Sequence, residues 1–154
     1  MGYRNSRWPR KFYQQQVAEI YKLFERKIQE SSSGIDYEQY LKICEELGQE
    51  PDPNRLPLET SSFPEEVQVA FFIYDFLPDR WEGMSGTYLG KDWSSAHFLL
   101  DLYEVDNRKV VIYFMKSYEI LVVNDRAEKA EQKRIAEERK SQRGAKEYTH
   151  NVRG

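Results

Sequence analysis

The chain has 154 residues and a mass of 18.4 kDa, enough for one domain with a single buried core. Its one cysteine excludes an internal disulfide framework, and no apolar run reaches the roughly 18 residues that span a bilayer. The net charge of −3 conceals a division along the chain. Residues 1–30 carry 7 Lys/Arg against 3 Asp/Glu (+4), residues 31–110 carry 6 against 16 (−10), and residues 111–154 carry 10 against 7 (+3). Basic ends and an acidic middle favour complementary contacts between protein surfaces.

The first element that we expect is an amphipathic helix over residues 9–30. Pro9 suits the first turn of such a helix. Apolar side chains recur at three- and four-residue spacing, as one buried helical face requires: Phe12, Val17, Ile20, Tyr21, Phe24 and Ile28.

A second, shorter helix is predicted to follow the serine-rich break. Asp36 and Gln39 resemble a capping box at its start, and Gly48 is placed to end it at the C′ position. Cys44 falls on its apolar face, so we expect a small buried side chain rather than a reactive thiol. Residues 49–61 contain three prolines and predict an extended linker.

The third helix is predicted to start at another capping box, formed by Ser62 and Glu65, with Pro64 in the first turn. Apolar residues fill Val67–Leu77 with almost no polar face. A helix that is apolar all round belongs in the centre of a core. Pro78 is expected to end it.

Two more helical segments are expected in the second half of the chain. The first spans residues 94–105, with an inward face of Phe98, Leu99, Leu102 and Tyr103. The second begins near residue 110, where the composition also suits strands. No turn chemistry interrupts residues 109–123, so we expect a helix there, and a strand hairpin over 109–123 is the alternative.

The helix near residue 110 is expected to run on into Ala127–Gln142, which is rich in Ala, Glu, Lys and Arg. Opposite charges four residues apart, Lys133–Glu137 and Arg134–Glu138, support a solvated helical extension. Because the large apolar residues concentrate in residues 67–77, 98–103 and 110–123, we expect the core in the second half of the chain.

The segment Asp79–Trp93 combines three glycines with two tryptophans and a tyrosine. Glycines permit unusual backbone angles, and tryptophans are large anchors at protein contacts. One interpretation is an ordered connection between helices, packed on its own aromatic side chains. The other, which is compatible with the first, is a protein-contact surface whose partner-binding residues are Arg80, Trp81, Met84, Tyr88, Lys91 and Trp93.

The pair Gly90-Lys91 before a helix also suggests a phosphate-binding loop. The spacing does not fit, because that pattern needs a glycine where Ser85 stands and a hydroxyl residue where Asp92 stands. A carboxylate at that position would repel phosphate. We therefore expect no nucleotide site, no cofactor and no small-molecule substrate.

The basic N-terminal segment offers an alternative function. Arginine interleaved with aromatic residues is how flexible arms hold single-stranded nucleic acid, and the residues concerned are Arg4, Arg7, Trp8, Arg10 and Lys11. The whole chain is acidic, with a pI of about 5.6, which disfavours a general nucleic-acid binder. The arm could equally dock on an acidic protein surface, including that of a neighbouring copy.

The remaining polar residues do not predict a catalytic centre. His97 and His150 are the only histidines, too few for a histidine-rich metal site, and His97 is expected at a surface or helix cap. Acidic pairs arise from composition alone in a segment of net charge −10. The sequence therefore predicts a protein without enzymatic activity.

The stretch Asp79–Trp93, with the preceding Phe71–Leu77, resembles segments of small helical accessory proteins of large tailed bacteriophages. The resemblance covers about thirty residues and is carried by Asp-Arg-Trp-Glu-Gly-Met-Ser-Gly. It implies a virion structural or assembly accessory role with no catalytic residues, in the host cytoplasm or in the virion.

Together these features predict an all-α protein, a compact bundle of about five helices with a long charged C-terminal helix; the alternative is an α+β fold. Residues 1–8 would form a flexible basic arm, residues 9–126 the helical domain, and residues 127–154 a charged helical extension with a frayed tail. The predicted function is a protein-interaction or assembly module whose partner is another protein, or other copies of itself, and not a membrane.

Overall fold

The computed structural model describes residues 10–34, 37–53, 55–56 and 58–151, with side chains described at 15–31, 34, 37–53, 55–56 and 58–144. The chain is mostly helical with one small antiparallel sheet. Its elements in chain order are α1 (Arg10–Ser33), α2 (Tyr37–Glu46), the 3-10 turn η1 (Thr60–Ser62), α3 (Glu65–Phe76), β1 (Asp79–Trp81), β2 (Tyr88–Lys91), α4 (Ala96–Leu102) and α5 (Arg108–Asn151).

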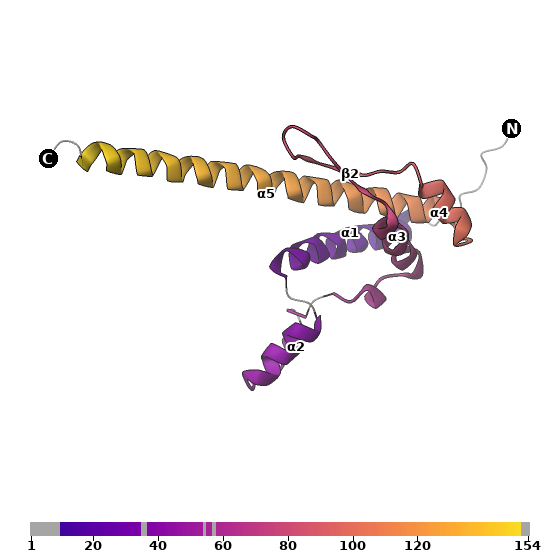
Figure 1. Ribbon diagram of the computed structural model, residues 1–154. Coiled ribbons are helices and arrows are strands. Elements are labelled where there is room, and N and C mark those ends of the chain that lie inside the picture. The colour runs from indigo at the N-terminus through magenta and orange to yellow at the C-terminus, as the bar shows by residue number, and fades with distance from the viewer. Residues whose placement is uncertain (1–9, 35–36, 54, 57, 152–154) are drawn as a thin grey trace.

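Helix α5 is the axis of the molecule. Helices α1 and α3 and the β1–β2 hairpin lie against its N-terminal half, while its C-terminal half projects beyond them (Figure 1). Helix α1 runs in the same direction as α5, because Phe24 contacts Phe114 and Tyr118, and Ile28 lies further along beside Val122. Helix α2 projects away from the core (Figure 1). No described helix is both long and apolar enough to cross a membrane.

The core is centred on Phe24 of α1, whose side chain is fully buried. Its ring lies 5.3–6.3 Å from aromatic rings of three other segments: Phe63, Phe71, Phe114 and Tyr118. The expectation of a core confined to the second half of the chain is therefore wrong. Helix α1 supplies the central ring, and the predicted helical spacing of Ile20, Phe24 and Ile28 is confirmed, since all three are buried.

Helix α3 is less completely enclosed than its sequence predicts. Val67 and Ile73 are fully buried, but Phe72 and Phe76 are 47% and 50% exposed. The predicted capping box is also wrong. Ser62 belongs to η1, the N-cap is Pro64 without a side-chain cap, and the Pro64 carbonyl accepts the amides at the first turn.

Helix α4 turns a different face to the core from the one predicted. Ala96, Leu99 and Leu100 are buried, whereas Phe98, Leu102 and Tyr103 are 64%, 59% and 44% exposed. The helix is only seven residues long and packs against α3 on one side. A periodicity of apolar residues on so short a helix does not decide which side faces inward.

The ambiguous segment over residues 109–123 is helical, so the alternative hairpin there is wrong. It belongs to the single helix α5, whose buried face includes Val111, Phe114 and Met115, each at most 3% exposed. The same helix continues through residue 127 without interruption, and the predicted pair Arg134–Glu138 is present at 3.6 Å.

A strand hairpin does occur, but at Asp79–Lys91 in place of the expected irregular connection. β1 and β2 pair antiparallel, with Asp79 opposite Lys91 and Trp81 opposite Tyr88. The register shift between these pairs leaves Leu89 as an extra residue, a β-bulge. The all-α prediction is therefore correct for most of the chain and wrong here.

The end of α2 follows the prediction. Gly48 adopts a left-handed φ of +63°, its amide bonds to the Glu45 carbonyl, and the Gln49 amide bonds to the Cys44 carbonyl. This pattern is the Schellman motif that a glycine at C′ makes possible. Cys44 is buried and unpaired, as expected.

Candidate functional site

The hairpin is fixed to α5 by one buried carboxylate, that of Glu119. The residue is only 6% exposed, and its Oε2 accepts hydrogen bonds from the Lys91 amide at 2.9 Å and from Trp93 Nε1 at 2.8 Å. Its Oε1 accepts a hydrogen bond from Lys116 Nζ at 2.7 Å. A buried carboxylate is tolerated only when it is paired and hydrogen-bonded. Here Lys116 pairs with it within α5, while the Lys91 amide and Trp93 tie the end of the hairpin and the residues after it to the helix.

The same contacts determine the ionisation of Glu119. Burial raises the pKa of Glu119, but the hydrogen bonds from Lys116, Lys91 and Trp93 outweigh it, so the pKa lies below its ordinary value. Lys116 Nζ also lies 5.0 Å from the centre of the Trp93 ring, a cation–π contact. Glu119 is therefore charged at neutral pH and acts as a structural anchor.

Gly90 is required at this junction for two reasons. Its φ of +97° is a conformation that side chains disfavour, and a β-carbon at this position would lie 2.9 Å from Cδ of Glu119. The close approach of the β2 backbone to α5 is what lets the Lys91 amide reach the carboxylate. Of the three glycines in the segment, this one explains how the hairpin docks.

The outer end of the hairpin is closed around a second carboxylate, that of Glu82. It accepts hydrogen bonds from the amides of Met84 and Ser85 and from the Ser85 hydroxyl, which lower the pKa of Glu82. Gly86 completes the turn with a φ of +67°. The turn is thus held by its own hydrogen bonds, and it presents the Met84 side chain, 98% exposed, at its tip.

The six predicted partner-binding residues fall into two groups. Arg80, Trp81 and Met84 are exposed on the hairpin, where a partner can reach them. The other three serve the fold: Tyr88 is 6% exposed and donates to Asp79, Lys91 pairs with Asp79 at 3.0 Å, and Trp93 bonds to Glu119. The interpretation as an ordered segment packed on its own aromatic side chains therefore fits Tyr88 and Trp93, whereas a protein contact through the exposed residues stays a prediction.

Trp81 is the largest exposed side chain of the hairpin, and its ring contacts two side chains, Tyr88 and Arg126. It lies 5.0 Å from the Tyr88 ring, and the Arg126 guanidinium of α5 lies 3.9 Å from Tyr88 and 5.5 Å from Trp81. Trp81 nevertheless stays 55% exposed, and the bulge residue Leu89 is 47% exposed. Trp81, Met84 and Leu89 form what we call the hairpin surface.

The geometry around Gly90-Lys91 differs from that of a phosphate-binding loop. Lys91 lies in a strand, its amide bonds to Glu119 and its ammonium group pairs with Asp79. The exposed amides of Met84 and Ser85 bond to Glu82. The protein's own carboxylates thus occupy the donors that an anionic ligand would need.

A cavity of about 520 Å³ lies beside the hairpin, between α1, α3 and α5. Three acidic and three basic side chains line it, and two opposite pairs are already formed, Lys91–Asp79 and Lys129–Asp125. Burial raises the pKa of Tyr118 at its wall to about 12, so this phenol stays neutral. The balanced charge gives the cavity no preference for an anion or a cation.

The other predicted residues contribute little to this site. Arg4, Arg7 and Trp8 lie outside the described residues, as do the side chains of Arg10 and Lys11. His97 is a surface residue, as expected, with its side chain 83% exposed and Nε2 3.3 Å from Asp101. Among the residues that the structure describes, no group of three or more His, Cys, Asp or Glu side chains could hold a metal ion.

Sequence reasoning missed the two α5 residues that organise the hairpin, Glu119 and Arg126. Glu119 carries a signal in retrospect: it is the only acidic residue in the apolar stretch 110–123, where a buried charge needs a partner. Arg126 lies in a charged segment and carries no such signal. Comparison with protein-family models, with curated proteins and with solved structures found no match.

Proposed function

We propose that the chain is a non-enzymatic protein-interaction or assembly module, and that the hairpin surface contacts the partner protein. The observation that carries this proposal is the combination of exposure and fixation. Trp81, Met84 and Leu89 are 47–98% exposed, yet they stand on a hairpin that Glu119 holds on α5. Apolar side chains presented on a fixed scaffold lose little conformational entropy when they bind.

The chemistry of the surface suits a protein partner. Tryptophan and arginine are enriched among the residues that dominate binding energy at protein interfaces, and Trp81 lies beside Arg126. The resemblance of residues 79–93 to phage accessory proteins favours an assembly role in a tailed bacteriophage, in the virion or in the cytoplasm of the host. This finer proposal depends on the resemblance and not on the geometry.

Site-specific photo-crosslinking in the cells that produce the protein tests the contact. The crosslinking residue replaces Gly83, because a side chain there would have nothing within 4 Å. We expect one discrete adduct with a partner protein. Trp81→Ala and Met84→Ser, placed in the same background, should each reduce the adduct at least tenfold.

A matched control removes an equally exposed apolar side chain elsewhere. Leu47 is 64% exposed beyond the end of α2, away from the hairpin (Figure 1). Leu47→Ala should leave the adduct unchanged, and all variants should keep the thermal midpoint of the parent. An adduct that survives both hairpin substitutions at full yield contradicts the proposal.

A further inference from the structure

A second exposed apolar surface lies on α3 and α4, separate from the hairpin surface. Phe72 and Phe76 of α3 and Tyr103, at the end of α4, contact one another with ring centres 5.0–5.7 Å apart, and each is 44–50% exposed. We call these three residues the aromatic patch. Phe98 and Leu102 of α4 are exposed as well. Clustered exposed aromatic residues on a small protein mark an interaction surface.

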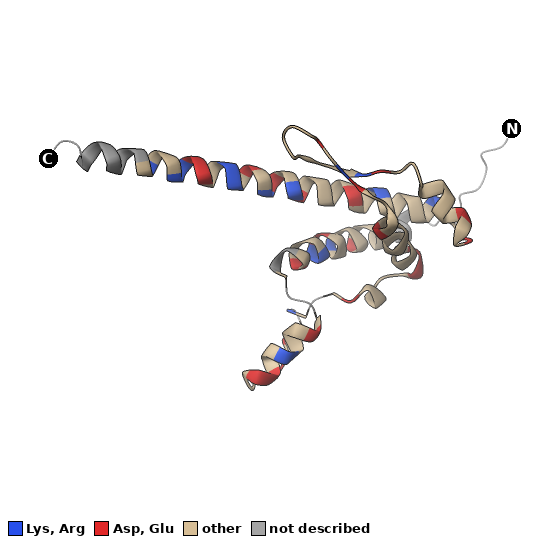
Figure 2. Cartoon of the chain, viewed as in Figure 1, with Lys and Arg blue, Asp and Glu red and all other residues tan. Residues whose placement is uncertain are grey.

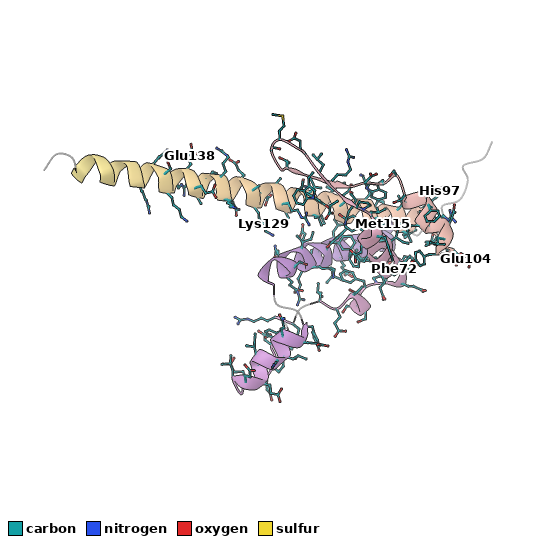
Figure 3. The ribbon with its side chains drawn as sticks, viewed as in Figure 1. Phe72, His97, Glu104, Met115, Lys129 and Glu138 are labelled. Atoms are coloured by element: carbon teal, nitrogen blue, oxygen red, sulfur yellow. The ribbon has the colours of Figure 1, made fainter. Side chains whose placement is uncertain are left out.

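An acidic cleft of about 440 Å³ adjoins the aromatic patch, and two residues of the patch, Phe72 and Tyr103, also line the cleft. Its lining includes no lysine or arginine but contains four carboxylates: Glu65, Glu66, Glu104 and Asp106. The first two lie in the first turn of α3, where the helix dipole favours them. Glu104 and Asp106 lie in the connection to α5, and Asp106 comes just before the N-terminal end of that helix. In Figure 3, Phe72 and Glu104 lie at the end of the molecule opposite the α5 extension.

The chain itself contains a segment of complementary chemistry. Its first eighteen residues contain four positive charges and no acidic residue, and they include four aromatic residues: Tyr3, Trp8, Phe12 and Tyr13. Arg4 and Arg7 lie within this segment. A cationic peptide with aromatic side chains fits an acidic cleft bordered by aromatic rings, through charge pairing and cation–π contacts.

The direction of α1 places the start of this helix, Arg10, toward the end of the core where the cleft lies. Because α1 runs parallel to α5 with Phe24 beside Phe114, the start of α1 lies fourteen residues, or about 21 Å, back toward the α4 end. Two copies that meet at this end around a two-fold axis could therefore exchange their N-terminal segments. Each segment would enter the other copy's cleft, and the two aromatic patches would be covered in the same contact.

We propose that the aromatic patch and the acidic cleft form a self-association surface, in which the cleft binds the N-terminal segment of a second copy. A segment folded back on its own chain would fill the cleft but leave the aromatic patch exposed, whereas the exchanged dimer fills both clefts and covers both aromatic patches. It also uses the charge division of the sequence, since the basic first thirty residues meet the acidic middle. The surface is distinct from the hairpin surface, so either proposal can fail without the other.

Charge reversal in the full-length chain tests the proposal. The arm-reversed variant carries Arg4→Glu and Arg7→Glu, and the cleft-reversed variant carries Glu104→Lys and Asp106→Lys. We expect the parent to show twice the 18.4 kDa chain mass by light scattering at micromolar concentrations. Each reversed variant should dissociate at least tenfold more readily, and the chain with both reversals should recover the dimer.

The control makes the same change of charge on the α5 extension. Glu128→Lys with Glu137→Lys, both exposed, should leave the dimer intact. Trp81→Ala should also leave it intact, which separates this test from that of the hairpin surface. Circular dichroism confirms that each variant is folded, and Glu104→Gln with Asp106→Asn serves as a milder cleft variant. Rising salt should dissociate the parent, as expected for exposed charges.

Three outcomes would overturn the proposal. A parent that is monomeric at all concentrations means that no second copy occupies the surface. A dimer that persists unchanged in the arm-reversed variant and in the cleft-reversed variant, each tested alone, is built on another face. Finally, a labelled single-stranded oligonucleotide that binds the parent but not the arm-reversed variant, without any self-association, would assign the N-terminal segment to nucleic acid.

Discussion

The two halves of α5 belong to one continuous helix, but different interactions stabilise each half. Residues 108–123 bury Val111, Phe114 and Met115 to at most 3% exposure, and α1, α3 and the hairpin pack on them. From residue 127 to residue 144 every side chain but the half-buried Ile135 is exposed. Figure 2 shows the contrast, with Lys/Arg and Asp/Glu spaced along the projecting half.

The difference separates two sources of helix stability. The first half is held by tertiary packing, which usually supplies most of the stability of a protein helix. The second half depends on helix propensity and on ion pairs one turn apart, such as Asp125–Lys129 at 2.5 Å and Glu131–Arg134 at 2.7 Å. Removing a side chain from the first half should therefore affect the whole fold, whereas a change in the second half should stay local.

The largest contrast comes from truncating one apolar side chain in each half. Phe114→Ala leaves a cavity beside Phe24 and should lower the free energy of unfolding by about 3–5 kcal/mol. Ile135→Ala, in the projecting half, should lower it by less than about 1 kcal/mol. Urea unfolding followed by circular dichroism at 222 nm measures both. Equal losses would mean that the projecting half also packs on something.

The junction between the hairpin and the packed half gives the next largest effect. Gly90→Ala forces a side chain into a φ of +97° and against Glu119, and should cost about 2–3 kcal/mol. Gly83→Ala is the matched control in the same hairpin, because that position has open space and no positive φ, so its cost should be near zero. A tolerated Gly90→Ala, with unchanged urea midpoint, would show that the hairpin is not tightly docked.

This comparison also shows which parts of the fold were readable from the sequence. Helical spacing identified α1 and the packed half of α5, because a buried helical face imposes its period on the chain. Turn chemistry identified the end of α2 at Gly48. The hairpin was missed because its short strands have no alternating pattern of apolar and polar residues. Its position also depends on a hydrogen bond from the Lys91 amide to the Glu119 side chain, 28 residues further along the chain.

The candidate site was predicted by composition rather than by geometry. The density of Gly and Trp correctly indicated an ordered segment, but it could not separate exposed Trp81 and Met84 from structural Tyr88 and Trp93. The aromatic patch was missed for a related reason. Phe72 and Phe76 were assigned to the core because apolar residues surround them in sequence, and a sequence does not reveal how much of a helix its neighbours cover.

Glu119 provides a further test of the difference between the two halves of α5, because it is a charged residue that the packed half buries. Glu119→Gln keeps the shape but removes the charge that Lys116, the Lys91 amide and Trp93 stabilise, and should cost about 1–3 kcal/mol at neutral pH. The folded pKa of Glu119 lies below its ordinary value of about 4.3. Its contribution is therefore full above that pH and is lost as the pH falls through the folded pKa.

The parent and Glu119→Gln should accordingly differ in urea midpoint at pH 7, and the difference should narrow as the pH falls below the ordinary pKa of a glutamate. Other carboxylates with lowered pKa values, such as Asp79 and Glu82, titrate in both proteins and cancel in the difference. A difference that stays constant from pH 7 to pH 3 would show that the charge of Glu119 contributes nothing and that only its shape matters.

The smallest expected effect on the free energy of unfolding comes from removing the projecting half of α5 as a whole. A chain that stops after Arg126 keeps the contacts of that residue with Trp81 and Tyr88. It loses the exposed turns that follow, together with the Lys129–Asp125 pair at the cavity. Its helical signal at 222 nm should fall in proportion to the residues removed, while its free energy of unfolding should change by less than about 0.5 kcal/mol. A local helix adds signal without adding cooperativity, because no described core side chain depends on it. If the shortened chain instead unfolds at markedly lower urea, the projecting half contributes to the core, and the division of α5 at residue 126 is wrong.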